Sequence, residues 1–437
     1  MPDKTANGPS LTSKVKSNIN LDSSNFSWNE NRKHHQPKQS DPKTSYAKRA
    51  ISKLEDRDIS GAVRILSSDE SFAPFDASTL ESLRLKHPTA SSQSFSSVPF
   101  SNSNSAPFQT CNEDILKAIF SFPSGSAGGI DGLWPQYLKD MVGLQTGAAG
   151  SKLVNSLTEL ANTMLRGAIP PTLCSILFGA NLCALRKKDG GIRPIAIGNT
   201  FRRLVSKLCN TMLIPKTTSF LLPFQYGIGV KGGAESVVHS LRASINANSH
   251  NNFTVLKIDF KNAFNMIHRD RILSIIADSY PEAYPFVSQA YGSPSCLAYK
   301  ENCIFSQRGV QQGDPLGPLL FSIVIQPLIS SLSSPFNSWY LDDGTLGGPS
   351  HVVEQDFQKI IDGCNELGLE LNFSKCKIFA YGSAEEAAKS IDSFCRIAPA
   401  VKILPINKLS LLGAPIHESL ISEAILNKLR NFDLIRT

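Results

Sequence analysis

The sequence predicts an α+β fold in which helices flank a core built from an antiparallel sheet. The strand candidates are short and are not spaced as regular strand–helix–strand units. Long amphipathic helical patterns separate them. A doubly wound parallel sheet would require regular alternation of strands and helices, so these observations favour the antiparallel arrangement.

The helix and strand candidates follow one another from about residue 110 onward. Residues 110–113 (Thr-Cys-Asn-Glu) have the spacing of a capping box, which predicts the start of the first helix. Segments with apolar residues at helical spacing are 114–122, 150–167, 201–213 and 234–248. Strand candidates are 175–187, 253–260, 338–343 and 370–382.

The most apolar run of the chain is 316–332. Pro318, Gln326 and Pro327 interrupt it, and it is shorter than the roughly 20 apolar residues needed to cross a bilayer. It therefore predicts a buried core helix and no membrane partner. Asp314 and the proline after it are predicted to be the N-cap and first residue of this helix.

The N-terminal quarter of the chain differs in composition from the rest. Residues 1–45 are rich in Ser, Asn, Lys and Asp, which is typical of disorder. Residues 46–68 predict two short helices, and 91–107 reads as a Ser/Asn-rich linker. The first residues, MPDKTANGPSL, lack the apolar run of a secretion signal, so we expect an intracellular protein in the cytoplasm, the nucleus or both.

Charge and cysteine content narrow the class further. The net charge of +7 leans weakly toward a polyanionic partner. The nine cysteines form no C-x-x-C pair and no zinc-ligand spacing. They predict ordinary buried thiols in a reducing compartment.

Two strand candidates end in carboxylates. The strand 255–258 runs into Asp259, and the strand at 338–341 runs into Asp342 and Asp343. The Asp-Gly step at 343–344 suits a tight hairpin turn. Because side chains alternate between the faces of a strand, we expect only one acid of the pair to face Asp259, and we choose Asp342. A lone Asp at a strand end is also a common helix cap or turn residue, which is the alternative for Asp259.

Convergent carboxylates of this kind indicate two-metal phosphoryl transfer. Mg²⁺ prefers carboxylate, phosphate and water oxygens, so two or three acids and a substrate triphosphate suffice to hold it. Two such ions activate an attacking hydroxyl and stabilise the leaving oxygen.

These residues resemble the palm of a reverse transcriptase. The resemblance rests on Asp259 with Phe264 five residues later, then 312–315 (Gln-Gly-Asp-Pro), then 340–343 (Tyr-Leu-Asp-Asp). Flanking segments such as LRKKDGGIRPIAIGNTFRRLVSK, FQYGIGVKGGAESVVHSLR and LSLLGAPI resemble further blocks of non-LTR (LINE-like) retrotransposon enzymes, in family order over about 110–420.

The resemblance implies a right-hand polymerase with fingers and palm. Because the chain ends at Thr437, the thumb is expected to be short or missing, and no endonuclease, zinc knuckle or RNase H carboxylate set is seen. The implied divisions are a disordered extension 1–45, short helices and linker 46–109, fingers 110–250, palm 251–400, and a primer-grip-like hairpin with truncated thumb 401–437.

The resemblance also assigns the acids and the residues around the nucleotide. Asp259 and Asp342 would be the principal ligands of two Mg²⁺ ions, with Asp343 beside them and Mn²⁺ as a possible substitute. Phe264 would exclude a 2′-hydroxyl, so the substrate would be a dNTP; its alternative is a core aromatic. Gln312 and Gly313 would lie against the nucleotide and template, where glycine permits close backbone approach.

The basic residues complete the implied site. Lys187 and Arg193 would hold the triphosphate, since an Arg fork binds phosphate bidentately and Lys adds a point charge. The alternative for this hairpin is a solvated loop. Lys375 would lie near the leaving pyrophosphate, with Lys377 as a competing candidate. The segment 411–416 would grip the primer.

The function implied is that of an RNA-directed DNA polymerase of a retrotransposon, extending a DNA primer with dNTPs on an RNA template. RNA-templated RNA synthesis is an alternative against which Phe264 argues. A second alternative is a catalytically inactive nucleic-acid-binding fragment of such a polymerase. A third is an unexpressed genomic fragment.

Overall fold

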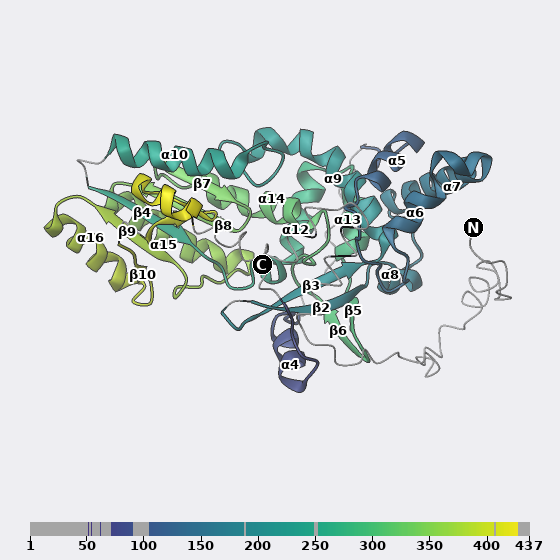
Figure 1. Ribbon diagram of the computed structural model, residues 1–437, viewed down its shortest axis with the longest axis horizontal. Helices are drawn as coiled ribbons and strands as arrows, with labels where there is room; N and C mark the ends of the chain where they lie inside the picture. The colour runs from purple at the N-terminus through teal and green to yellow at the C-terminus, as the bar shows by residue number, and fades with distance from the viewer. Residues whose placement is uncertain are drawn as a thin grey trace.

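The computed structural model describes residues 71–90, 105–187, 189–248, 252–405 and 408–426, together with the isolated positions 51, 54 and 62 (Figure 1). The predictions for residues 1–45, for the helices at 46–68, for most of the Ser/Asn-rich linker and for the final residues of the chain lie outside this part. Over the described residues no helix has both the length and the apolar character needed to cross a membrane.

A five-stranded sheet, here called the central sheet, has the strand order β10-β9-β4-β8-β7. Strand β4 lies in its middle and runs antiparallel to β8 and to β9. The bounds are β4 Phe253–Ile258, β7 Phe336–Tyr340, β8 Asp343–Gly348, β9 Lys377–Tyr381 and β10 Lys402–Ile403. The predicted antiparallel core is therefore present, with β10 as a parallel edge strand.

Alternating side chains of β4 bury both faces of the central sheet. Val255 packs in a cluster with α10, and the next residue, Leu256, packs in the main core with Phe357 of α15. Helix α10 thus covers one face, while α14, α15 and α16 lie toward the other (Figure 1). A strand that is buried on both faces carries apolar residues at consecutive positions, as β4 does at Val255 and Leu256.

A second sheet, here called the outer sheet, is built around the hairpin of β2 and β3. Strand β2 pairs antiparallel with β3 and β1, and parallel with β5, which in turn pairs with β6. The bounds are β1 Ser71–Phe72, β2 Ala180–Arg186, β3 Ile192–Gly198, β5 Ser295–Tyr299 and β6 Asn302–Ser306. A short hairpin near the C-terminus pairs β11 Ser410–Leu411 with β12 Ala414–Pro415.

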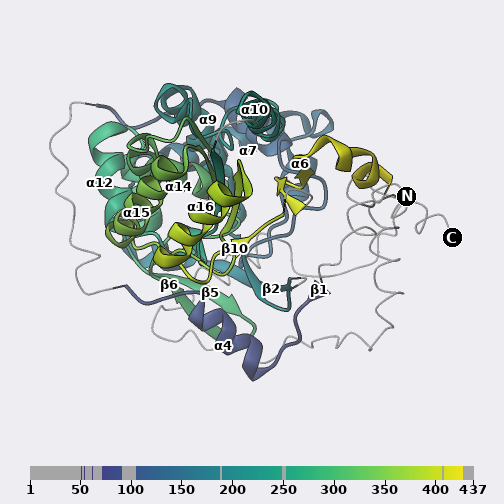
Figure 2. The ribbon, with the colours of Figure 1, turned by 90° about the vertical axis from the view of Figure 1, so that its left-hand side faces the viewer.

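The outer sheet crosses two of the divisions expected from the sequence. Strands β5 and β6 lie in the range expected for the palm, yet they pair with β2 in the range expected for the fingers. Strand β1 and helix α4, expected as part of a linker region, pack on the same sheet; α4 lies beneath β2, β5 and β6 in Figure 2. Sequence order did not reveal this because β2 meets β5 more than 100 residues further along the chain.

Helices surround both sheets; most of them share one large apolar core, whereas α10 and α4 pack in two smaller clusters. That core contains residues of α5, α7, α9, α14 and β4, and α14 is buried along almost its whole length, as predicted. The helices are α4 Ala77–Leu85, α5 Asn112–Phe120, α6 Pro135–Met141, α7 Gly147–Leu165, α8 Pro171–Leu177, α9 Thr200–Leu221, α10 Gly233–Ala247, α11 Ala263–Met266, α12 Arg269–Ser279, α13 Tyr284–Tyr291, α14 Gly317–Ser330, α15 Ser350–Leu367 and α16 Ala384–Ile397. Single 3₁₀ turns span Leu144–Thr146 and Glu418–Leu420.

Neither predicted residue is the N-cap of its helix. Helix α5 begins after Cys111, and no side chain caps it; the Thr110 amide instead donates a 2.8 Å hydrogen bond to Oδ1 of Asn162. Helix α14 begins at Gly317 with Pro318 in its first turn, so Asp314 lies before the helix.

Asp314 lies before the helix and uses its two carboxylate oxygens for different partners. Its Oδ1 accepts a 3.1 Å hydrogen bond from the Leu316 amide, just ahead of α14. Its Oδ2 lies 2.8 Å from an Nη of Arg202 and accepts a 2.5 Å hydrogen bond from the Tyr291 hydroxyl. The buried guanidinium of Arg202 needs this carboxylate partner. The pair joins α9 to the turn ahead of α14.

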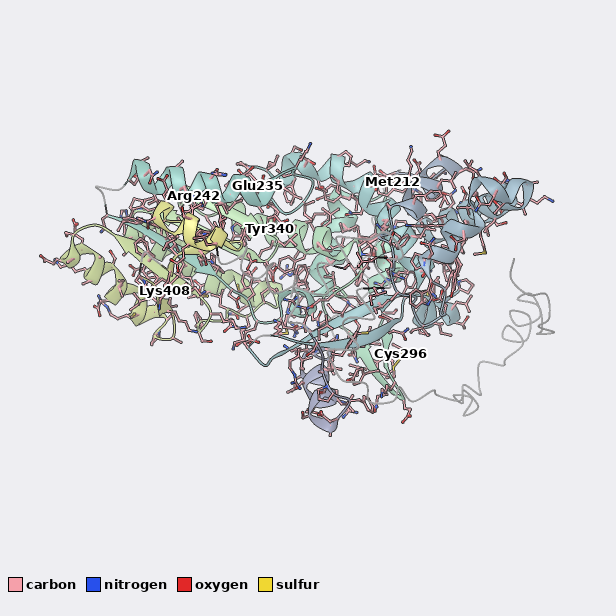
Figure 3. The ribbon with its side chains drawn as sticks, viewed as in Figure 1. Met212, Glu235, Arg242, Cys296, Tyr340 and Lys408 are labelled. Atoms are coloured by element: carbon pink, nitrogen blue, oxygen red, sulfur yellow. A yellow bond between two sulfur atoms is a disulfide. The ribbon has the colours of Figure 1, made fainter. Side chains whose placement is uncertain are left out.

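One pair of cysteines departs from the sequence prediction of free thiols. Cys296 of β5 and Cys303 of β6 form a disulfide, with Cα atoms 5.8 Å apart (Figure 3). The hairpin of β5 and β6 brings them together on neighbouring strands. Of the other cysteines, Cys209, Cys364 and Cys376 are buried free thiols, as predicted.

Candidate active site

The acidic residues gather where β4 ends beside the hairpin of β7 and β8. Ile258, the last residue of β4, pairs with Gly344 of β8. Extending this antiparallel register by one residue places Asp259 opposite Asp343. Opposed residues of an antiparallel pair have Cβ atoms about 4.5–5.5 Å apart, so these two carboxylates are neighbours.

The turn that carries Asp342 differs from the predicted Asp-Gly turn. Tyr340 pairs with Asp343, so the two turn residues are Leu341 and Asp342 (Tyr340 is labelled in Figure 3). Leu341 has φ 57°, a left-handed conformation that is rare for a branched side chain. The prediction that Asp343 turns away from Asp259 therefore needs correction, because Asp343 opens β8 opposite Asp259 and Asp342 occupies the turn.

Gln225 holds this turn, and the sequence analysis did not single it out. Its side chain is fully buried, its Oε1 accepts a 2.7 Å hydrogen bond from the Leu341 amide, and its Nε2 donates a 3.1 Å bond to the Leu341 carbonyl. Both backbone groups of the left-handed residue are thus satisfied by one side chain. The only sequence signal was the place of Gln225 in the FQYGIGVKGG block.

The three carboxylates influence one another electrostatically. Burial, followed by the negative charges of Asp343 and Asp259, raises the pKa of Asp342 to about 6. Burial also raises the pKa of Asp343, partly offset by Lys257. Asp259 has its pKa raised by burial and lowered by Lys375 and by a hydrogen bond from Asn372, among others.

This set of donors suits a hard divalent cation. Across the described residues no three acid, histidine or cysteine side chains converge as a preformed metal cage. Mg²⁺ does not require one, since it is held by one or two carboxylates together with waters and substrate phosphates. The mutual repulsion that raises the pKa of Asp342 is the feature a cation would relieve. Asp259, Asp342 and Asp343 therefore fit a divalent-metal site.

Basic side chains from the outer sheet and the segment before β9 face the acids. Lys187 follows β2, and Lys375 lies in the turn before β9; both lower the pKa of Asp259, so both stand near it. The Lys375 ammonium pairs with Asp189 of the β2–β3 turn at 2.9 Å. Arg193 lies on β3, opposite Leu185, with its side chain exposed. Lys377, the competing candidate, lies within β9 opposite Lys257.

The Gln312–Gly313 turn packs against β3. The Gln312 carbonyl accepts a 2.7 Å hydrogen bond from the Ala196 amide. Gly313 has φ 125°, and a Cβ there would lie 2.3 Å from the Ala196 carbonyl oxygen. Glycine is required at this position because two backbones touch. The preceding Gln311 is buried and bonds to Phe178 and Ser295, which fixes the turn from behind.

Phe264 is half-buried, with one ring face on the core. Its ring centroid lies 4.9 Å from that of Phe321 in α14, and its carbonyl accepts a 2.7 Å hydrogen bond from the Val310 amide. Phe264 therefore packs as a core aromatic while part of its ring remains exposed. The two alternatives for this residue are compatible.

The C-terminal hairpin reaches the acidic site through Lys257. Its ammonium donates a 2.7 Å hydrogen bond to the carbonyl of Ser410 in β11, and it also offsets the charge of Asp343. Leu412 and Gly413 form the turn, both with positive φ. The segment 411–416 is therefore a tight hairpin beside the acids.

The chain belongs to the reverse transcriptase family. The family model described as "Reverse transcriptase (RNA-dependent DNA polymerase)" matches residues 185–410, more than half of the chain. This range contains the acids, the basic residues and the turns described above, except for the turn of the C-terminal hairpin at Leu412 and Gly413. The predicted resemblance to the reverse transcriptases of non-LTR retrotransposons is confirmed.

Two relatives are proteins of retrotransposable elements. The retrotransposable element SLACS 132 kDa protein of Trypanosoma brucei gambiense is 25% identical over 283 residues, which are 61% of this chain and 22% of that protein. The retrovirus-related Pol polyprotein from type-1 retrotransposable element R2 of Popillia japonica is 26% identical over 243 residues, 51% of this chain and 30% of that protein. The chain thus spans less than a third of the length of either relative.

Solved structures of telomerase from Candida tropicalis are also similar. One, in complex with a fragment of telomeric RNA, has a TM-score of 0.38 at 12% identity and covers 48% of this chain and 41% of that chain. The apo form, truncated from its C-terminal domain, has a TM-score of 0.39 at 14% identity and covers 55% and 53%. The family assignment rests on the match over residues 185–410.

Proposed function

We propose that this chain is an RNA-directed DNA polymerase of a retrotransposon. It extends the 3′-hydroxyl of a DNA primer with dNTPs on an RNA template and releases pyrophosphate. The observation that carries the proposal is the gathering of three carboxylates at the end of β4, opposite the basic side chains of the β2–β3 hairpin and of Lys375. In this reading the outer sheet belongs to the fingers and the central sheet is the palm.

Asp259, Asp342 and Asp343 would hold two Mg²⁺ ions, for which Mn²⁺ could substitute. When bound, the metal supplies Lewis-acid activation of the primer hydroxyl and neutralises charge on the leaving oxygen. The protein's part is to place the carboxylates before substrate arrives. The buried Gln225 side chain and the β4–β8 register support that role, because both fix the backbone beneath the acids.

The basic residues would bind the triphosphate. Lys187 and Arg193 would bind its oxygens from the hairpin, with the guanidinium suited to bidentate contact. Lys375 would exchange its ion pair with Asp189 for the leaving pyrophosphate and donate a proton to it from Nζ.

Other residues around the nucleotide would select the sugar and contact the template. The exposed part of the Phe264 ring would stand under the sugar and exclude a 2′-hydroxyl, with Phe321 holding the ring in place. Gln312 and Gly313 would lie against nucleotide and template, and the hairpin segment 411–416 would lie against the primer. The net charge of +7 is consistent with an RNA–DNA partner inside the cell.

Primer extension tests the proposal directly. Purified chain, poly(rA)/oligo(dT), dTTP and Mg²⁺ should give incorporation, and Asp342→Asn should abolish it. Asp392→Asn, an exposed acid on α16, is the matched control and should retain full activity. If wild type incorporates dTTP no better than Asp342→Asn, polymerase activity is refuted.

The inactive alternative makes the opposite prediction. A nucleic-acid-binding fragment would bind the primer–template in a salt-dependent way without incorporation. That binding would be unchanged in Asp259→Asn and Asp342→Asn. Fluorescence anisotropy of labelled primer–template on the same protein samples separates the two outcomes.

A further inference from the structure

Helix α4, which precedes the part of the chain matched by the family, is tied to the acidic site. Its C-cap residue is Lys86. The Lys86 carbonyl accepts hydrogen bonds from Nδ2 of Asn262 at 2.7 Å and from Nδ2 of Asn265 at 3.0 Å. Asn262 follows Asp259 by three residues and has φ 52°, so the end of α4 is anchored to the bend that leaves the catalytic strand.

The side chain of Lys86 joins the basic group already described. Burial, then the positive charges of Lys187 and Lys375, lowers the pKa of Lys86, and Asp189 acts in the opposite direction. Three ammonium groups from three distant parts of the sequence therefore lie near one another, and two of them, Lys187 and Lys375, also act on Asp259.

Among these three ammonium groups, Lys375 forms an ion pair within the described residues, with Asp189. Lys187 acts on Asp189, Asp259 and Asp342, whereas the one acid whose charge acts on Lys86 is Asp189. Lys86 therefore has less negative charge near it than its two neighbours, which favours an added anion beside it. Lys86 is also only half-exposed, which limits how far water can compensate.

We propose that Lys86 is a third cation for the triphosphate of the incoming nucleotide, so that residues 71–90 form a wall of the nucleotide site. The inference rests on the proposed polymerase function and deepens it. The acids mark where the reacting phosphate lies, and the β- and γ-phosphates must lie beyond it, on the side of Lys187 and Lys375. A triphosphate matches a compact group of three ammoniums better than an extended nucleic-acid backbone does.

The anchor permits a clean mutational test. The hydrogen bonds from Asn262 and Asn265 go to the backbone carbonyl of Lys86, so Lys86→Gln removes the charge and leaves both bonds available. Arg84→Gln is the matched control, since Arg84 lies in the last turn of the same helix, is exposed, and faces Glu81 at 3.8 Å. Lys86→Arg keeps the charge and should retain the wild-type KM for dTTP.

In primer extension on the full chain, Lys86→Gln should raise KM for dTTP about tenfold and leave kcat within about twofold. Arg84→Gln and Lys86→Arg should resemble wild type. An unchanged KM in Lys86→Gln overturns the inference. Weaker primer–template binding with unchanged KM also overturns it, by assigning Lys86 to the nucleic-acid backbone.

A binding measurement keeps the inference separate from the polymerase proposal. Isothermal titration with inorganic tripolyphosphate needs no turnover, and wild type should bind it about tenfold more tightly than Lys86→Gln. If primer extension fails but wild type still binds tripolyphosphate more tightly than Lys86→Gln, the triphosphate site is supported and the polymerase proposal is refuted. If wild type binds no tripolyphosphate, or binds it no better than Lys86→Gln, the inference is wrong.

Discussion

The acidic side and the basic side of the site are held in different ways. Asp259, Asp342 and Asp343 stand on the central sheet, where strand register and the buried Gln225 side chain fix the backbone. The basic side depends on the tip of the β2–β3 hairpin, where Asp189 and Lys375 form a pair of half-exposed side chains.

This difference indicates that the backbone is most rigid beneath the carboxylates, where a small displacement would change the reaction rate most. A metal site tolerates little displacement of its carboxylates, so their backbone is fixed by buried contacts. A triphosphate must enter and pyrophosphate must leave, so the basic side is held by exposed pairs, which stabilise by only about 0–1 kcal/mol. Removing contacts on the two sides should therefore have very different consequences.

The largest effect is expected at the buried pair that joins α9 to the turn ahead of α14. Asp314→Ala leaves Arg202 buried without its carboxylate and removes the acceptor of the Tyr291 hydroxyl. The free energy of unfolding should fall by about 3–5 kcal/mol, measured by urea denaturation. Asp392→Ala, which breaks the exposed pair with Arg396, should change it by less than about 0.5 kcal/mol. Equal small losses would show that the buried pair contributes no more to stability than the exposed pair does.

Gln225→Leu should separate positioning from stability. Without its two hydrogen bonds the Leu341 turn relaxes and Asp342 moves, and displacement of about 1 Å lowers kcat about 100-fold. Gln225→Glu should be intermediate, because a carboxylate accepts from the Leu341 amide but cannot donate to its carbonyl.

Gln289→Leu is the control for Gln225. Gln289 of α13 bonds both backbone groups of Ile169, since its Oε1 accepts from the Ile169 amide at 3.2 Å and its Nε2 donates to the Ile169 carbonyl at 2.7 Å. Its loss should lower the unfolding free energy by a similar amount while kcat at saturating dTTP stays near wild type. A comparable fall in kcat for both variants would contradict a positioning role for Gln225.

Asp189→Asn should have a small, favourable effect. It should strengthen binding of dTTP, whereas the variants above lower stability or kcat. It frees Lys375 and removes a negative charge beside the triphosphate, so KM for dTTP should fall about two- to threefold with kcat unchanged. Asp140→Asn, an exposed acid on α6, should leave KM unchanged. A rise in KM would mean that Asp189 orders the hairpin for binding.

The smallest expected effect is a shift in the pH dependence of divalent-metal binding by the three acids. Asp342 keeps its proton up to about pH 6, so divalent-metal binding should strengthen as pH rises through that value. Its folded-state pKa is raised, so its contribution to stability without metal is present below about pH 4 and is lost as pH rises through about 6.

Asp343→Asn removes the like charge next to Asp342 and should move the midpoint of metal binding down by about half a pH unit. This midpoint is measured by electron paramagnetic resonance of bound Mn²⁺ between pH 5 and 7.5, in about 0.15 M salt. Asp392→Asn should leave the midpoint in place. No shift in Asp343→Asn would mean that Asp343 and Asp342 are not coupled.

The sequence by itself determined the class of the fold and the elements that deliver the acids. The apolar strand 255–258 ends at Asp259, the run 316–332 contains a buried helix, and the segment 411–416 folds as a hairpin. These features are local, since strand alternation, apolar continuity and turn residues act over a few neighbouring positions. The order of the family blocks added the polymerase class.

Only the tertiary structure decided how these elements are held. Leu341 adopts its left-handed turn because Gln225, 116 residues away, satisfies its backbone. Asp314 is buried as the partner of Arg202, 112 residues away. Lys86 reaches the site because Asn262, 176 residues away, binds its carbonyl. Each outcome depends on a buried polar group finding its partner across the fold, and sequence spacing carries no record of that distance.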